Sequence, residues 1–125
     1  MDPLVLDQRD LGFIVGLLVG EGSFGGDGKQ PQITLRMHTR HRDLFERLVL
    51  LVPGSRLYGP YHHGGRNYLQ WMARGQVLRH SLAPALIECL ELMDAYTRQR
   101  FETMCRTYGL VAVVTEPVAD QAEEA

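Results

Sequence analysis

The separation of apolar from polar positions is clearest near the start of the chain, where residues 11–20 carry no polar side chain. Asp10 precedes this run and Glu21 follows it. Because the run is continuous, it predicts a buried helix over residues 7–20, with Asp7 or Asp10 capping its start. A membrane span needs roughly 18 or more apolar residues, so this run is too short to be one.

Beyond residue 20, alternating segments predict strands. In residues 32–39 the apolar side chains Ile33, Leu35 and Met37 alternate with polar ones, which is typical of a strand buried on one face. The expected elements in chain order are a helix at 7–20, strands at 21–26 and 32–39, a helix at 40–51, strands at 55–61 and 67–74, and helices at 76–93 and 95–108. We expect the segments 25–31 and 62–66 to be a turn and a loop.

One choice stays open in the strand 67–74. One face of this strand carries Leu69, Trp71 and Ala73, and the other carries Tyr68, Gln70, Met72 and Arg74. Trp71 would suit either a buried or an exposed position, so the pattern does not decide which face is outward. The helix at 76–93 could be kinked at Pro84, because proline cannot donate the backbone hydrogen bond of a helix interior.

The order α-β-β-α-β-β-α-α predicts an α+β fold, with four antiparallel strands and the helices on one face of the sheet. The opposite face would be polar, basic and uncovered. The length of 125 residues favours one domain, which we place at residues 1–110. The remaining residues, 111–125, form an acidic tail that we expect to be disordered.

Charge is distributed unevenly along the chain, although the net charge is only −2. Residues 115–125 hold four acidic side chains and no base, which leaves 13 basic against 11 acidic residues elsewhere. Residues 28–80 contain nine basic and two acidic side chains, together with all five histidines. Such a segment attracts a polyanion, or it forms a solvated, arginine-rich surface.

The cellular location follows from composition and from the N-terminus. The 45% hydrophobic and 22% charged residues are ordinary for a soluble globular protein. The two cysteines are far apart and are expected to be reduced thiols. The acidic N-terminus does not resemble a secretion signal. We therefore expect a cytoplasmic protein, in a bacterial cytosol or an organelle matrix, with no membrane partner.

An uncovered sheet with arginine and glutamine side chains can lie in the major groove of duplex DNA. Arginine pairs with guanine there and glutamine pairs with adenine. The residues that we expect to contact DNA are Lys29, Gln32, Thr34, Arg36, His38, Arg40, Arg56, Tyr58, Arg66, Gln70 and Arg74.

Three glycines recur every four residues in the first helix, at Gly12, Gly16 and Gly20. This spacing puts them on one side of a helix, where a second helix could approach the backbone closely. Each interior glycine costs the helix about 1 kcal/mol relative to alanine, and a close helix contact would compensate for that cost.

Residues 14–22 (IVGLLVGEG), followed by Ser23 and Phe24, resemble the LAGLIDADG motif of homing endonucleases. The expected order of helices and strands is similar to the fold of that family. The resemblance covers about residues 10–108. It includes the strand at 67–71 and the segment 54–58 before it, which resemble later strands of the family.

The resemblance implies a site-specific endonuclease that hydrolyses phosphodiester bonds of double-stranded DNA with a divalent metal. In the family, the penultimate acid of the motif holds the metal, so the corresponding ligands here are the Glu21 carboxylate and the Gly20 carbonyl. The implied ion is Mg²⁺ or Mn²⁺, with Ca²⁺ supporting binding without cleavage. A single motif implies a homodimer on a pseudo-palindromic site. Its interface would contain Gly12, Phe13, Gly16, Leu17 and Gly20.

The sequence departs from the family pattern at the position of an assisting lysine, which in the family often follows the fourth strand. The only lysine here is Lys29, in the first turn, and the nearest basic candidates are Arg98 and Arg100. Arginine cannot act as a base near neutral pH, so these two catalytic candidates could only stabilise charge. Val19 also stands where the motif often has an acid.

Two other function classes stay open. One is a DNA-binding protein on the same scaffold that no longer cuts, either a regulator or an RNA-splicing maturase with RNA as a partner. The missing lysine favours this reading. The other is a structural or interaction domain that binds no nucleic acid.

Overall fold

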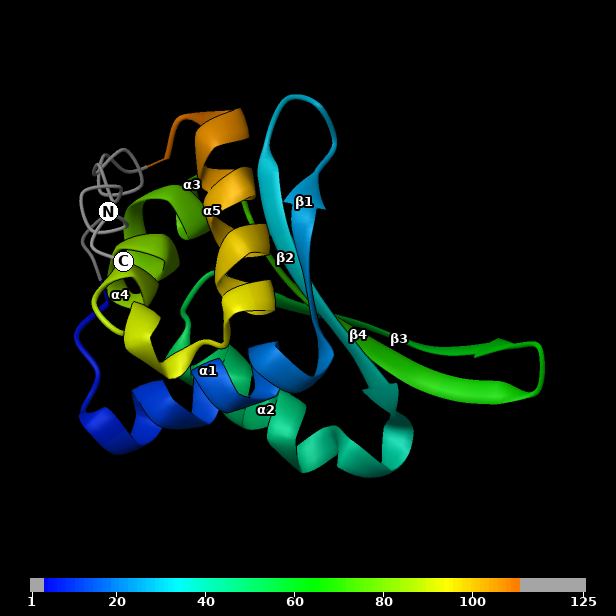
Figure 1. Cartoon of the computed structure of the whole chain (residues 1–125). Helices are drawn as coiled ribbons and strands as arrows, with labels where there is room; N and C mark the ends of the chain where they lie inside the picture. Colours follow the sequence, from blue (N-terminus) through cyan, green and yellow to red (C-terminus); the bar gives the residue numbers. More distant parts are fainter. Residues whose placement is uncertain (1–3, 111–125) are drawn as a thin grey trace.

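A computed structural model of the chain describes residues 4–110 and confirms the α+β fold. Its four strands form one antiparallel sheet in the order β1-β2-β4-β3. The helices gather on one side of the sheet, and the other side is open (Figure 1). The expected acidic tail at 111–125 lies outside the described residues.

The elements follow the expected order, with some changes at their ends. They are α1 (Gln8–Glu21), β1 (Gly22–Gly26), β2 (Pro31–His38), the 3₁₀ turn η1 (Thr39–His41), α2 (Arg42–Leu51), β3 (Arg56–His63), β4 (Arg66–Arg74), α3 (Gly75–Val77), the π-helical turn η2 (Leu78–Leu82), α4 (Ala83–Ile87), the 3₁₀ turn η3 (Leu90–Leu92) and α5 (Ala95–Tyr108). Within residues 4–110, no helix has the length and apolar character that a membrane crossing requires.

Helix α1 begins at the expected cap and ends one residue later than expected. The Asp7 carboxylate accepts a hydrogen bond from the backbone N–H of Asp10 at 2.8 Å. At the other end, the N–H of Gly22 donates to the carbonyl of Leu18, so the helix includes Glu21. The buried face of α1 is formed by Ile14, Val15 and Leu18. Glu21 is therefore the last residue of α1 and lies directly before β1, where the chain enters the sheet.

The register of β2 against β4 settles which face of β4 is buried. Trp71 lies opposite Leu35, Leu69 lies opposite Met37, and the Trp71 side chain has no exposed surface. On the other face, Arg36 lies opposite Gln70. The tryptophan face therefore belongs to the core, and the polar face of β4 continues the polar face of β2.

The β3–β4 hairpin is longer than the sequence indicates. The expected loop at 62–66 is wrong, because β3 continues to His63 and β4 begins at Arg66. Only Gly64 and Gly65 form the turn, with φ angles of 60° and 79°, and glycine adopts such positive values without steric cost. A register shift between Tyr58 and Tyr61 accommodates Gly59 and Pro60 within β3. The resulting hairpin extends well beyond the helices (Figure 1).

The expected single helix at 76–93 is also wrong, because the segment is divided into α3, η2, α4 and η3. The backbone N–H of Ala83 donates to the carbonyl of Leu78, five residues earlier, which makes the turn before Pro84 π-helical. Pro84 has no N–H to continue an ordinary helical ladder there. Leu78, Leu82 and Leu86 nevertheless lie on the inner side of this divided segment, where all three are fully buried.

A buried hydrogen-bond chain fixes Trp71 in the core. The indole Nε1–H donates to Ser55 Oγ at 2.9 Å, and the Ser55 hydroxyl donates to the carbonyl of Val52 at 2.7 Å. We predict that Ser55→Ala lowers the free energy of unfolding by about 1–3 kcal/mol, because the buried indole N–H loses its acceptor. Denaturant unfolding followed by tryptophan fluorescence measures this, with the exposed Ser23→Ala as control. Equal stability of the two variants would contradict the prediction.

Candidate nucleic-acid interface and metal site

The open face of the sheet is basic because β2, β3 and β4 contain arginines and histidines but no aspartate or glutamate. Alternation along the three strands places nine of the eleven predicted contact residues on this face. They are Gln32, Thr34, Arg36, His38, Arg56, Tyr58, Arg66, Gln70 and Arg74. The other two flank the sheet, Lys29 in the β1–β2 turn and Arg40 in η1.

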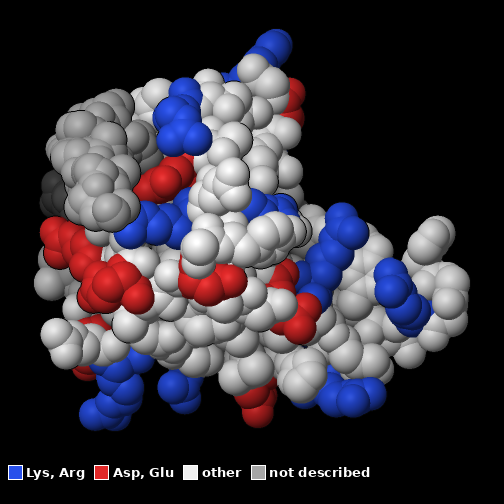
Figure 2. Space-filling view, in the orientation of Figure 1, with Lys and Arg blue, Asp and Glu red and all other residues white. Residues whose placement is uncertain are grey.

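The space-filling view shows how charge differs between the projecting hairpin and the helical body, where basic and acidic atoms are mixed (Figure 2). Over the projecting hairpin, at the right of the view, it shows Lys and Arg atoms and no Asp or Glu atoms. Asp and Glu atoms lie mainly over the helical body. The projecting hairpin therefore extends the basic surface of β2, β3 and β4, which attracts anions.

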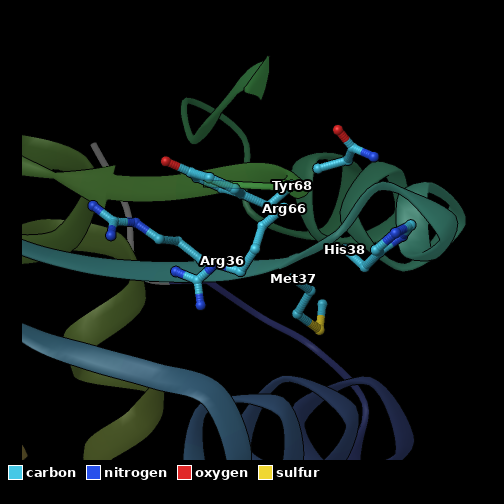
Figure 3. A pocket seen from close by; sticks show the side chains of 7 residues that line it. Arg36, Met37, His38, Arg66 and Tyr68 are labelled. Atoms are coloured by element: carbon cyan, nitrogen blue, oxygen red, sulfur yellow. The ribbon is translucent and has the colours of Figure 1, made fainter. Parts of the chain in front are cut away.

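A hollow of about 310 Å³ lies where β2 ends beside the projecting hairpin. Figure 3 shows the side chains of Arg36, Arg66 and Tyr68 around it, with His38 at the end of β2. Arg36 Nε donates to Gln70 Oε1 at 2.6 Å, and its guanidinium carbon lies 5.9 Å from the centroid of the Tyr68 ring. These two contacts hold the Arg36 guanidinium in one orientation on the open face.

The predicted set omits Tyr68, although the alternation along β4 places it on the same face as Gln70. Its ring lies 5.3 Å from the ring of Tyr61, centroid to centroid, across the β3–β4 hairpin. Tyr61 was hidden from the sequence pattern by the register shift that precedes it in β3. The two rings give the face an aromatic surface beside its arginines.

A second hollow, of about 380 Å³, lies at the other end of the face, and Gln30, Arg56, Tyr58 and Arg74 are among its lining residues. Arg74 Nη2 lies 3.1 Å from the carboxylate of Asp27 in the β1–β2 turn. The face therefore offers donor side chains at both ends, and at this end one of the two arginines, Arg74, already has an anionic partner.

Glu21 is exposed at the C-terminal end of α1. Among residues 4–110, no hydrogen bond or ion pair involves its carboxylate, and the last turn of α1 contains no basic residue. A carboxylate at the negative end of a helix is electrostatically unfavourable unless a cation lies nearby. The adjacent Gly20 carbonyl belongs to the last turn, whose carbonyls lack the usual intrahelical partners. Both groups are oxygen ligands of the kind that Mg²⁺ prefers.

No single cluster in the described part of the chain would surround a metal ion, since it contains no group of three or more His, Cys, Asp or Glu side chains suited to that role. At the end of α1, the described residues therefore offer a metal ion a single carboxylate, that of Glu21. The fit to a hard cation rests on this exposed carboxylate and on the helix-end carbonyl beside it.

The glycine side of α1 is open. A Cβ atom added at Gly12, Gly16 or Gly20 would meet no atom of the chain within 4 Å. Packing inside the chain therefore does not explain why these positions are glycine. Phe13 and Leu17, the other predicted interface residues, are only partly buried against the core.

Arg98 and Arg100 lie in the first half of α5 and have partners on that helix. Arg98 Nε is 2.9 Å from Glu102 Oε2, and Arg100 Nη1 donates to the Tyr96 hydroxyl at 3.0 Å. Within residues 4–110, no hydrogen bond or ion pair joins either arginine to Glu21. The structure does not bring these catalytic candidates into direct contact with the predicted metal ligand.

Comparison with known proteins identifies no relative, since no protein-family model and no curated protein matches the chain. The functions of the open face and of the end of α1 therefore rest on the chemistry of their own residues.

Proposed function

We propose that this protein is a homodimeric, metal-dependent endonuclease that binds duplex DNA on the open face of its sheet. The observation that carries the proposal is the combination of an open sheet face, whose strands β2, β3 and β4 contain no acidic residue, with the carboxylate of Glu21 at the end of α1, which has no partner among residues 4–110. The first attracts a polyanion and the second suits a divalent cation. A metal-dependent nuclease needs both.

The shape of the open face supports binding in the major groove. A two-stranded β-ribbon fits that groove, and the β3–β4 hairpin extends from the body as such a ribbon (Figure 1). Arg36 and Arg66 supply donors for guanine or phosphate, and Gln32 can pair with adenine. Because the arginines of β2, β3 and β4 are distributed along the whole face, an extended duplex suits it better than a small anion.

The open side of α1 supports a homodimer. If two copies pack in parallel along Gly12, Gly16 and Gly20, the C-terminal ends of both α1 helices lie near the two-fold axis, and each copy brings its own Glu21 there. A two-fold dimer reads a pseudo-palindromic site. When bound, Mg²⁺ or Mn²⁺ would neutralise charge on the phosphoryl oxygens and lower the pKa of a water. Glu21 and the Gly20 carbonyl would hold it, and Ca²⁺ would support binding alone.

A second candidate is a non-cleaving nucleic-acid binder on the same scaffold, either a DNA regulator or an RNA-splicing maturase. The contacts of α5 favour it, because Arg98 and Arg100 are engaged by Glu102 and Tyr96. The only lysine, Lys29, lies in the β1–β2 turn. Such a protein would keep the open face and lose the hydrolytic step.

A selection experiment distinguishes these functions. Purified protein is incubated with a randomised duplex library at low salt, first with Ca²⁺ and then with Mg²⁺, and the recovered fragments are sequenced. A pseudo-palindromic consensus that is cut only with Mg²⁺ is the expected result. A consensus that is bound but never cut would support the non-cleaving candidate. Failure to enrich any sequence, and failure to bind structured RNA, would contradict both.

The acidic residues of the segment 111–125 give a separate prediction for duplex affinity. Removing residues 111–125 deletes four acidic residues and no basic one, which leaves 13 basic against 11 acidic residues. We expect duplex affinity at low salt to rise about three- to tenfold, on the scale of about 1 kcal/mol for exposed charges. The gain should shrink as salt rises. Fluorescence anisotropy at two salt concentrations measures it.

The matched control for the truncation keeps the chain length and replaces the four acids with their amides, at Glu116, Asp120, Glu123 and Glu124. This full-length variant should show the same gain in affinity. A gain in the truncated chain alone would mean that the effect of residues 111–125 is not electrostatic.

A further inference from the structure

The β1–β2 turn places an acidic side chain beside the open face. Within residues 4–110, Asp27 is the only acidic residue that forms an ion pair with an arginine of this face. Its partner, Arg74, is at the end of β4, opposite Gln32 on β2. An acid at this point weakens the attraction for phosphate, so its presence needs a reason within the proposed binding mode.

The Asp27 carboxylate is fixed by the turn that contains it. Its Oδ1 atom accepts hydrogen bonds from the backbone N–H groups of Lys29 at 2.8 Å and Gln30 at 2.7 Å. These bonds, with a smaller contribution from Arg74, lower the pKa of Asp27, so the group is ionised at neutral pH. The turn is held from its other side, because the Gly28 N–H donates to the Tyr108 hydroxyl at 3.0 Å. The second carboxylate oxygen, Oδ2, is left for Arg74.

Arg74 is oriented by this contact but is not covered by it. Its Nη2 atom donates to Asp27 Oδ2 at 3.1 Å, while 46% of the side chain remains exposed. A guanidinium has five N–H donors, so most of them stay available. The same side chain lines the second hollow, together with Arg56 and Tyr58. The contact with Asp27 therefore sets the direction in which the planar guanidinium of Arg74 presents its remaining N–H donors.

We infer that Asp27 is a positioning residue that holds Arg74 for the recognition of a guanine edge in the major groove. This inference rests on the proposed function, because it concerns duplex binding on the same face. A guanidinium pairs in bidentate fashion with O6 and N7 of guanine. The carboxylate partner offsets its charge, which reduces its attraction to phosphate at any sequence. It also restricts a flexible side chain before binding, so less rotamer freedom is lost on contact.

The variant Asp27→Asn tests the inference. The asparagine side-chain oxygen can still accept from the N–H groups of Lys29 and Gln30, so the turn is preserved while the anionic partner of Arg74 is removed. We expect the preference for guanine at one position of each half-site to fall about five- to hundredfold, the range for one bidentate base contact. Affinity for a guanine-free alternating dA·dT duplex should rise severalfold.

The measurements are dissociation constants for the selected duplex and for its single-base-pair variants, at one fixed salt concentration. Asp43→Asn on α2 is the matched control, because it makes the same charge change away from the sheet. Arg74→Gln should lose preference at the same position as Asp27→Asn. The double variant should lose no more than Arg74→Gln alone, since both substitutions remove one interaction.

The outcomes separate this inference from the proposed function. If Asp27→Asn keeps every base preference of the wild type, or weakens all sequences equally, Asp27 does not position Arg74 and the inference is overturned while duplex binding stands. If the wild type binds no duplex from the randomised library, the proposed function itself is overturned. Loss of preference at a position that Arg74→Gln leaves unaffected would also overturn the inference.

Discussion

Replacing Glu21 with glutamine should reduce Mg²⁺-dependent duplex cleavage by at least about a thousandfold while leaving duplex affinity within a fewfold of wild type. Glutamine has nearly the same size as glutamate but no negative charge, so it is a poor ligand for a hard cation. A bound divalent ion contributes several kcal/mol of charge stabilisation to phosphoryl hydrolysis, and each 1.36 kcal/mol changes the rate tenfold. Glu21 is exposed at the end of α1, so its replacement removes no contact from the core.

Two measurements are needed on the selected duplex, single-turnover cleavage with Mg²⁺ and the dissociation constant with Ca²⁺. The matched control is Glu46→Gln, which removes one exposed carboxylate from α2 instead. That variant should cut at the wild-type rate. Normal cleavage by Glu21→Gln would show that the metal ligand lies elsewhere. Equal loss of cleavage and of binding would mean that Glu21 acts in folding or assembly.

The sequence predicts this fold well wherever a local pattern decides the structure. The alternation through Ile33 and Leu35 defines the buried face of β2, and Asp7 marks the start of α1. The pattern fails where tertiary contacts decide. The buried face of β4 depends on the pairing of Trp71 with Leu35 across the sheet and on the hydrogen bond from the indole to Ser55, and neither is visible in the local sequence.

The sequence pattern did not predict the length of the β3–β4 hairpin or the division of the 76–93 helix, for a related reason. The Gly-Pro pair in β3 is a usual strand breaker, but here a register shift lets pairing resume at Tyr61. Pro84 indicated a kink, but the apolar stripe around it could not reveal that the helix divides into separate turns. At Pro84 the backbone changes its hydrogen bonding while Leu78, Leu82 and Leu86 stay buried, whereas in β3 the register shift also moves Tyr61 to the face of Tyr68.

In the candidate site, too, local patterns were predictable from the sequence and tertiary contacts were not. Arg36 was predictable because the period of a strand places it on the polar face of β2, and the same period puts Gln70 and Arg74 together on one face of β4. The role of Asp27 was not, because its ion pair joins residues 47 positions apart. The strongest indication of an interface is the glycine side of α1, where an added Cβ would meet no atom within 4 Å.

Replacing Gly16 with leucine should convert the proposed dimer to a folded monomer. A Cβ at Gly16 meets nothing within the chain, so leucine fits the isolated protein, and it improves helix propensity by about 0.8 kcal/mol. In a seam where two helices meet backbone to backbone, the same side chain overpacks the contact. Overpacking costs about 1–3 kcal/mol per site, and a two-fold seam contains the site twice. The dissociation constant of the dimer should therefore rise at least about thirtyfold.

Sedimentation equilibrium over a range of concentrations measures this change, and circular dichroism shows whether the monomer keeps its helices. Thr103→Leu, at an exposed position of α5, introduces the same side chain away from the seam and should leave the assembly unchanged. The leucine variant at position 16 should also bind a single half-site no worse than wild type, because the open face is untouched, but it should lose tight binding to the full pseudo-palindrome. A dimer that survives this substitution would place the interface on another surface. In that case Glu21 would not lie at a two-fold axis, and a mechanism with one carboxylate from each copy would have to be abandoned even if the open face still bound DNA.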